Sequence, residues 1–305
     1  MSQNFCELVH RLRIQFQLIL VYKSNRFAVH GRAELGFLDF ITGKDHVRID
    51  FKGYQFEIFH RPGEWLDQES LSAIQRRMVN ITLESCGKHP RNGFYVDASL
   101  LRNKTITICT KDDANCAFGV MTNIGMYGKR SIVHIGPYYS AVKDRGLMTL
   151  TFLFGGQYFL LKNKLRGVHF TSITHVPRVF GLLVECFSNV YPNKNPASLP
   201  SEAQVDIRDM LMNSYVKEIE PQYQERLGED FILRAFRLQG DGSIVPYPHT
   251  AETVPKHRSQ EYNERCLHMI DYERGDAMIL VGEAGVRNYF TNFGRNFLRA
   301  VQKGR

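Results

Sequence analysis

A short basic loop in the middle of the chain has residue types that could hold an anion. Lys143 and Arg145 lie on either side of Asp144, and Gly146 follows them at the start of an apolar run long enough for a helix. The first backbone N–H groups of a helix have no partner within it, and the helix dipole adds partial positive charge there. A pyrophosphate fits such a place, with two basic side chains beside it and a glycine that allows close approach. A solvated turn before a helix has the same residue types, so both interpretations stay open.

The distribution of charge points to the same region. The chain has 305 residues, with 39 Lys and Arg against 31 Asp and Glu and a formal net charge of +8. Residues 101–200 contain 12 basic and 4 acidic residues, so the surplus of this third equals that of the whole chain. With 43% hydrophobic residues, including 21 Phe and 14 Tyr, the chain can fill a core, which excludes a disordered protein.

The sequence lacks the patterns that are typical of several other classes of protein. The six cysteines form no CxxC pair and no zinc-like spacing, so we expect reduced thiols and no bound metal. The apolar run at residues 16–22 is too short to span a bilayer, and the N-terminal region has no secretory signal pattern. These observations predict a cytoplasmic protein without a membrane-spanning segment.

Hydrophobic periodicity predicts a helical N-terminal region, residues 1–46, followed by strands and helices. Strands are predicted at residues 47–60 (a strand or a hairpin about Gly53), 104–110, 115–125, 130–141, 168–175, 232–238 and 277–283. Helices are predicted at residues 70–87 with Ser70 as N-cap and Gly87 as stop, at 146–165, at 177–191 starting from Pro177, near 202–219, and after the last strand. This order predicts an α/β fold with a mixed sheet.

Three local features add detail to these elements. Gly136 and Pro137 lie inside a predicted strand, and they should bulge it or end its pairing. Gly155 and Gly156 lie inside a predicted helix, which favours close packing of that helix on the sheet. The polar loop at residues 239–274 is about 35 residues long, and loops of that length are more often functional or mobile than structural.

The stretch from Arg130 to Pro192 resembles the acyl-CoA core of the GNAT (Gcn5-related) N-acyltransferase superfamily. Four parts occur in the family's order: a bulged strand (RSIVHIGPYYSA), a basic loop entering a helix (VKDRGLMTL), a strand (VHFTSITH) and a Pro-initiated helix (VPRVFGLLVECF). The resemblance implies a central, twisted mixed sheet flanked by helices. It also implies an N-terminal helical extension at 1–46, a GNAT-like core at 47–245 and a C-terminal extension at 246–305, together forming one compact domain.

In that family an acyl group moves from a CoA thioester to an amine by direct attack, and the resemblance implies the same reaction here. The acyl donor would be an acyl-CoA, with acetyl or a longer chain, or an acyl-carrier protein. Residues at the matching positions would bind CoA: Tyr138, Ser140, Lys143, Arg145, Gly146, Leu147, Met148 and Thr149. Met148 stands where the family has a second small residue. A backbone N–H near Tyr138 to Ser140 would polarise the acyl carbonyl.

The resemblance also suggests which residues would move protons. The attacking amine must be deprotonated, and His134 and His175, on the two matching strands, are the best-placed bases. Leu183 falls where many family members have the tyrosine that protonates the departing thiolate. Tyr139 is the first candidate to replace it, with Tyr191 and Ser140 as alternatives.

The acceptor is expected to be a small amine or an amino acid derivative. The family binds it with the helical segment between the first strands, here residues 65–86, and with the last hairpin. Two other functions stay open: a basic protein that binds or modifies nucleic acid, and a GNAT fold that has lost catalysis and serves as a binding module. No recognised nucleic-acid motif is present, which makes nucleic acid the less favoured partner.

Overall fold

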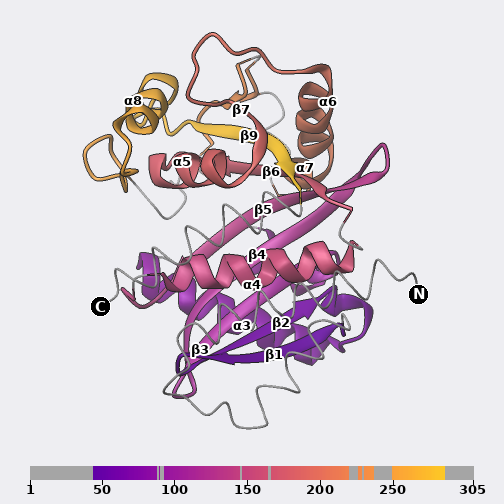
Figure 1. Ribbon diagram of the computed structural model, residues 1–305. Helices are drawn as coiled ribbons and strands as arrows, with labels where there is room; N and C mark the ends of the chain where they lie inside the picture. The colour runs from indigo at the N-terminus through magenta and orange to yellow at the C-terminus, as the bar shows by residue number, and fades with distance from the viewer. Residues whose placement is uncertain are drawn as a thin grey trace, which may run out of the picture.

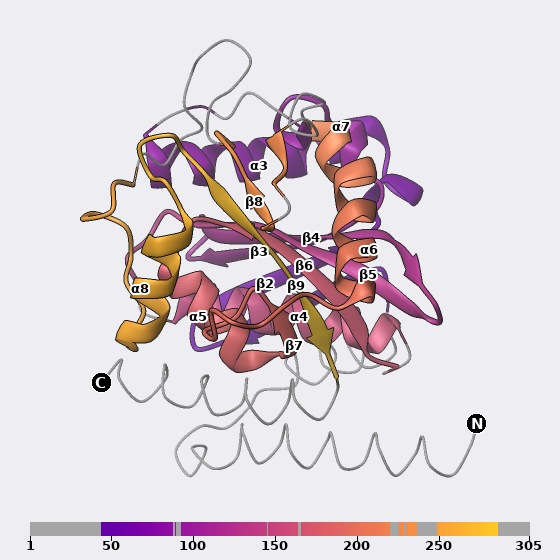
Figure 2. The same ribbon diagram turned by 90° about the horizontal axis from the view of Figure 1, so that it is seen from above.

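The computed structural model describes residues 44–87, 89, 93–144, 146–163, 166–219, 226–228, 230–236 and 249–285. Its centre is a mixed sheet in the order β1-β2-β3-β4-β5-β6-β9-β7, with β8 also paired to β9. Helices cover both faces of this sheet (Figures 1 and 2). The predicted α/β fold with a mixed sheet is therefore confirmed. The predicted helices within residues 1–43 and after the last strand lie outside the described residues.

The first five strands form an antiparallel meander. They are β1 (His46–Phe51), β2 (Tyr54–His60), β3 (Lys104–Lys111), β4 (Ala114–Tyr127) and β5 (Arg130–Ser140). Two of the turns are short hairpin turns in which both central residues have positive φ: Lys52 and Gly53, then Asp112 and Asp113. Such turns match the twist of the flanking strands. The predicted hairpin about Gly53 is confirmed.

The second part of the sheet joins segments that are distant in the sequence. β6 (Val168–Thr174) runs parallel to β5 and antiparallel to β9 (Ala277–Ala284), and β9 lies between β6 and the short strand β7 (Ser188–Tyr191). β8 (Ile232–Leu233) extends the same edge of β9. Two predictions were wrong here. Residues 188–191 form a strand rather than the end of a helix, because β9 offers them an open edge, and the strand predicted at 232–238 has only two residues.

One face of the sheet is covered by α3 (Gln68–Cys86), with the short helices η1 (Pro62–Glu64), η2 (Gly93–Tyr95) and η3 (Ala98–Leu101) nearby. The buried side of α3 packs on the apolar side chains of β3 and β4. Its N-cap is Asp67, whose carboxylate accepts the Ser70 N–H at 2.7 Å, so the predicted N-cap at Ser70 was wrong. Gly87 ends the helix with positive φ, as predicted.

Further along the same face lie α6 (Glu202–Leu211), the π-helical turn η4 (Met212–Val216) and α7 (Lys217–Ile219), over β5, β6 and β9. The opposite face carries α4 (Leu147–Lys162), α5 (Pro177–Cys186) and α8 (Gln260–Met269). Figure 2 shows α3 above the sheet and α4 below it, with α6 at the right. A Cβ on Gly155 would lie 2.7 Å from the Thr107 hydroxyl, so the predicted close packing of this helix on the sheet is confirmed.

Candidate active site

The strands β5 and β6 separate toward their carboxyl ends. They pair only over residues 132–135 and 169–172. Beyond that point β5 stays paired with β4, from Tyr138 opposite Gly119 to Ser140 opposite Ala117, whereas β6 stays paired with β9. The edge of β5 at residues 136–140 therefore faces an opening in the sheet, which we call the β5–β6 opening.

A bulge bends β5 where the opening begins. Between the pairs Met121–Ile135 and Gly119–Tyr138, β5 has one residue more than β4. The extra residue falls at Gly136 and Pro137, so the predicted bulge is confirmed. Bulges re-aim the side chains that follow them and are common next to active sites.

Helix α4 begins at the same end of the sheet. Its N-cap, Gly146, has φ +92°, a left-handed conformation that favours glycine. The first turn consists of Leu147, Met148 and Thr149. The Leu147 N–H donates to the Asp144 carbonyl oxygen at 3.4 Å, whereas the Met148 and Thr149 N–H groups by helix geometry point out of the helix start. Leu147 is buried, and Met148 is partly buried and packs against the core.

The loop before α4 has one exposed cation and one carboxylate that accepts a hydrogen bond. Lys143 is exposed, and Asp144 accepts a hydrogen bond from the Tyr54 hydroxyl. Burial together with the Asp144 carboxylate raises the pKa of Tyr54, so this phenol stays protonated. Arg145 lies outside the described residues.

The side chains of the last residues of β5 lie on both faces of the sheet. The Tyr138 ring covers Gly119 and meets Phe152 of α4 edge-on, with ring centroids 5.4 Å apart. Tyr139 faces the other side, where its ring centroid lies 5.6 Å from that of Phe118. The Ser140 hydroxyl lies 2.7 Å from the Val142 carbonyl oxygen. The predicted CoA-binding residues that are described thus lie together at one end of the sheet, with side chains on both faces.

A row of polar side chains crosses the face that carries α3 and η4. Lys104, Thr122, His134 and Thr171 are lateral neighbours on β3, β4, β5 and β6, and all four are buried. Lys104 is only 1% exposed, and its Nζ lies 3.2 Å from Asn103 Oδ1 and 3.6 Å from Glu218 Oε1. Burial lowers the pKa of Lys104, and Glu218 opposes that effect.

His134 lies in the middle of this row. Its Nδ1 is 3.0 Å from the Thr171 hydroxyl, and its ring centroid is 4.1 Å from that of Tyr215 on η4. Burial and the positive charge of Lys104 lower the pKa of His134 to about 3. The imidazole is therefore uncharged at neutral pH and is a weak base. Its predicted role as the base that deprotonates the amine stays a prediction.

Tyr215 places a hydroxyl beside the bulge. This oxygen lies 3.6 Å from the position that a Cβ would take on Gly136. Burial raises the pKa of Tyr215, so the phenol remains protonated over the whole physiological range. The sequence offered no signal for this residue, because η4 reads as an uninterrupted helix. π-Helical turns are nevertheless frequent at functional sites.

The other predicted catalytic residue, His175, lies apart from His134. It follows the end of β6, and its carbonyl oxygen accepts a hydrogen bond of 2.6 Å from the Tyr272 hydroxyl. Four residues of extended chain separate it from Thr171, the partner of His134, a distance of roughly 13 Å. Tyr191, an alternative proton donor, packs edge-on against Phe231 at 4.8 Å. The structure therefore does not bring these residues together with His134.

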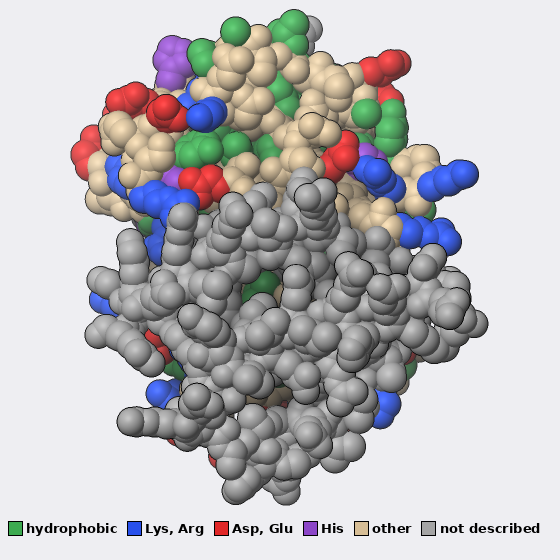
Figure 3. Space-filling view, viewed as in Figure 1, with side chains coloured by type: hydrophobic (Ala, Val, Ile, Leu, Met, Phe, Trp, Pro, Cys, Tyr) green, Lys and Arg blue, Asp and Glu red, His purple; other side chains and the backbone are tan. Residues whose placement is uncertain are grey.

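The described residues contain no disulfide and no metal cluster. Cys86, Cys109, Cys116, Cys186 and Cys266 form no disulfide with one another. Over the described part of the chain, no group of three or more His, Cys, Asp or Glu side chains could hold a metal ion. No described helix combines the length and apolar character needed to cross a bilayer. Figure 3 shows basic and acidic side chains intermixed on the described part of one face.

Comparisons with known proteins leave the family open. No model of a known protein family matches the chain, and no curated protein matches its sequence. Solved structures that resemble it include the structure of L-PGS from Bacillus licheniformis, with 12% identity and a TM-score of 0.28. That alignment covers 92% of this chain and 64% of the L-PGS chain, so this chain spans less than two thirds of that protein. At that TM-score the likeness supports no conclusion about fold or function.

Proposed function

We propose that the protein transfers an acyl group from a thioester, an acyl-CoA or an acyl-carrier protein, to an amine by direct attack. The observation that carries this proposal is the β5–β6 opening, which has the start of α4 on one face and the Tyr215 hydroxyl on the other. The opening supplies a strand edge to which no other described strand is paired, α4 supplies an anion-binding helix start, and Tyr215 supplies a proton donor.

The residues at the start of α4 fit the phosphates of CoA. The N–H groups of Met148 and Thr149 bind phosphate oxygens, and Lys143 supplies positive charge. Backbone N–H groups of β5 between Tyr138 and Ser140 polarise the acyl carbonyl, because no described strand pairs with that part of β5 on the side of the opening.

Tyr215 acts as the general acid. The amine nitrogen attacks the carbonyl carbon, the new C–N bond forms and the C–S bond breaks. The thiolate then receives the Tyr215 proton, and the extra proton of the amine returns to the Tyr215 phenolate, so that no net proton is gained or lost. The raised pKa of Tyr215 means that the phenol is protonated before the reaction begins and enters it as a proton donor.

The donor site is tested by isothermal titration with acetyl-CoA and longer acyl-CoAs. We expect binding tighter than millimolar, and we expect Arg145→Glu, which reverses a charge in the predicted phosphate loop, to weaken it about tenfold or more. Lys129→Glu is the matched control, because Lys129 is an exposed cation at the other end of β5. If no acyl-CoA binds and an acyl-carrier protein does not replace it, the proposal fails.

The proton donor is tested by Tyr215→Phe. We expect the rate of acyl transfer to fall between about tenfold and a thousandfold, with donor affinity unchanged, because the ring keeps its packing on His134. Tyr127→Phe is the control, since Tyr127 donates to Asp206 on the surface and lies far along β4 from the opening. An unchanged rate for Tyr215→Phe would remove this residue from the mechanism.

A further inference from the structure

A hollow outside the β5–β6 opening is built from charged side chains. It has a volume of about 480 Å³, and its lining comes from β7, the ends of β8, the last turns of α8 and the turn before β9. Much of this lining lies within residues 239–274, for which the sequence suggested a polar loop; that prediction was wrong in part, because α8 lies within this segment. A hollow of this size suits a small molecule, since ligand pockets are commonly about 300–1,000 Å³.

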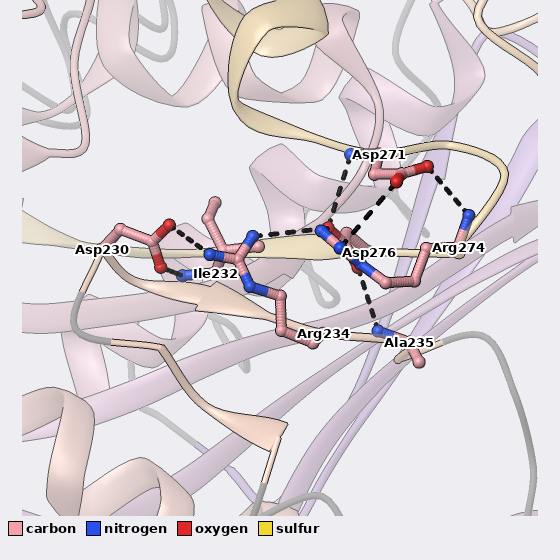
Figure 4. Close-up of polar contacts among 7 residues, drawn as sticks. All are labelled: Asp230, Ile232, Arg234, Ala235, Asp271, Arg274 and Asp276. Atoms are coloured by element: carbon pink, nitrogen blue, oxygen red, sulfur yellow. Dashed lines mark hydrogen bonds and ion pairs between the residues drawn. The ribbon is translucent and has the colours of Figure 1, made fainter.

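A fully buried carboxylate holds two of the arginines that line the hollow. Asp276 is 0% exposed and accepts hydrogen bonds from Arg274 Nε at 2.7 Å and from the Ala235 N–H at 3.0 Å. Arg234 Nη1 reaches the same carboxylate at 3.5 Å. Burial alone would raise the pKa of Asp276, but Arg274 and the Ala235 N–H outweigh it and lower the pKa. Figure 4 shows both guanidinium groups directed at Asp276.

Asp276 therefore fixes two guanidinium groups side by side. Arg234 comes from the end of β8 and Arg274 from the turn before β9, and their side chains are 37% and 46% exposed. Arg234 Nη2 also donates to Asp230 at 2.6 Å, and Arg274 Nη1 lies 3.9 Å from Asp271 Oδ2, so each guanidinium lies between Asp276 and one of these acids. A guanidinium has five N–H donors in a rigid fork, and the donors that these contacts leave over, on two fixed and half-exposed arginines, suit a carboxylate ligand.

Two acidic side chains border the same hollow. Asp230 and Asp271 both line it, and they are 50% and 47% exposed. With Arg265, the three arginines of the lining are formally balanced by these two carboxylates and Asp276 beneath them. A polyanion gains little from such a balanced site. A ligand with one positive and one negative group can contact both kinds of side chain.

We propose that this hollow binds a zwitterionic small molecule, a free amino acid or a close derivative, with its carboxylate on Arg234 and Arg274 and its ammonium group near Asp230 and Asp271. The hollow lies at the end of β9 where Met278 pairs with Thr174, the last residue of β6. It thus shares one end of the sheet with the β5–β6 opening. Binding stands independently of acyl transfer, and only the further role of the bound molecule as acyl acceptor rests on the proposed function.

The test is equilibrium binding to the full chain, measured by isothermal titration without any acyl donor. The probes are the twenty standard amino acids, then the amide and the des-amino acid of the tightest binder. We expect at least one amino acid to bind, and we expect loss of either charged group to weaken binding about tenfold or more, as loss of a charged hydrogen bond does. If no amino acid binds at 10 mM, about the weakest affinity that titration detects, the inference is wrong.

Two variants assign the charged groups to their partners. Arg274→Gln should abolish the preference for the amino acid over its amide, and Asp271→Asn should abolish the preference over the des-amino acid. Asp271→Asn is the safer variant for folding, because an asparagine oxygen still accepts the Arg274 N–H that Asp271 now accepts at 2.9 Å. Arg130→Gln is the matched control, since Arg130 is also 46% exposed and also paired with a carboxylate, Glu283, at the other end of the sheet.

The outcomes separate this inference from the proposed function. If the variants leave both preferences intact, or if Arg130→Gln changes them equally, the hollow is not the site. If amino acids bind as expected but no acyl donor binds, the inference holds and the proposed function fails. If acyl-CoA binds and amines are acylated, but Arg274→Gln does not change the binding of amino acids, the proposed function holds and the inference fails.

Discussion

At the scale of single residues, burial decides what a titratable group can do. The sequence identified His134 as a candidate base, but the protonation of this residue could not be predicted, because it depends first on burial and then on Lys104 two strands away. Lys104 could have been noticed, because it stands in the alternating pattern of Ile106 and Ile108 and thus on the apolar side of the strand. Tyr215 could not, because its position depends on a local change of helix type.

The low pKa of His134 predicts a pH dependence of stability. The folded protein binds this proton only near pH 3, whereas the unfolded chain binds it near 6.5, the ordinary pKa of a histidine. Between these values the unfolded chain holds more protons, so the free energy of unfolding falls as the pH falls and is fully retained above pH 6.5. The loss approaches about 1.4 kcal/mol for each pH unit.

His134→Gln, whose side chain can still bond to Thr171, isolates this effect. We expect the stability advantage of the wild type over the variant to shrink as the pH is lowered from 6.5, measured by urea unfolding at several pH values. His60, whose pKa burial lowers to about 4, is present in both proteins and cancels in the comparison. An advantage that stays constant with pH would mean that His134 is not buried uncharged.

At the scale of elements, the sequence correctly predicted the turns and helix ends that depend on residues close together in the sequence. The turns at Gly53 and Gly87 and the helix start at Pro177 follow from local conformational preference, and all three are confirmed. The predictions were wrong where pairing with a distant segment determines the secondary structure. Residues 188–191 have an apolar pattern that a helix could continue, yet they pair with β9, which lies about 90 residues further along the chain. Nothing in the local sequence indicates that these residues pair with β9.

The contact between α4 and β3 yields a prediction about packing. Gly155→Ala places a methyl group 2.7 Å from the Thr107 hydroxyl, so we expect overpacking of about 1–3 kcal/mol to exceed the gain in helix propensity. Thr107→Ala removes that oxygen, and in this background Gly155→Ala should be neutral or stabilising. Urea unfolding of the four proteins gives the coupling energy, and additive effects would contradict close packing of α4 on β3.

At the scale of the whole molecule, one apolar core joins the two ends of the sheet. The largest cluster of buried side chains contains Val47 of β1 and Ala284 of β9, together with residues of α4, α5 and α8. Composition predicted that such a core exists, but not that a single sheet continues from β1 to β7. The pairing of β6 with β9 creates that continuity, and it joins the two regions that we propose to bind ligands.

A continuous core predicts cooperative opening. In hydrogen exchange measured by mass spectrometry at increasing denaturant, peptides from β3 and β9 should lose protection at the same concentration, because neither strand can leave without exposing the shared core. Peptides from exposed turns, such as the one around Asp112, serve as the control and should exchange without denaturant. Earlier loss of protection at β9 would divide the sheet into two units.

The position of β9 also determines when this protein can finish folding. β1 to β5 are joined by short turns or by local helical segments, so they can assemble as soon as each strand is made. β6 must wait for β9, about a hundred residues later, and closing so long a loop is entropically slow. Until then one edge of β6 has no strand beside it, and such an edge can pair with another chain. During synthesis this molecule is therefore most exposed to aggregation through the strand that borders its candidate active site.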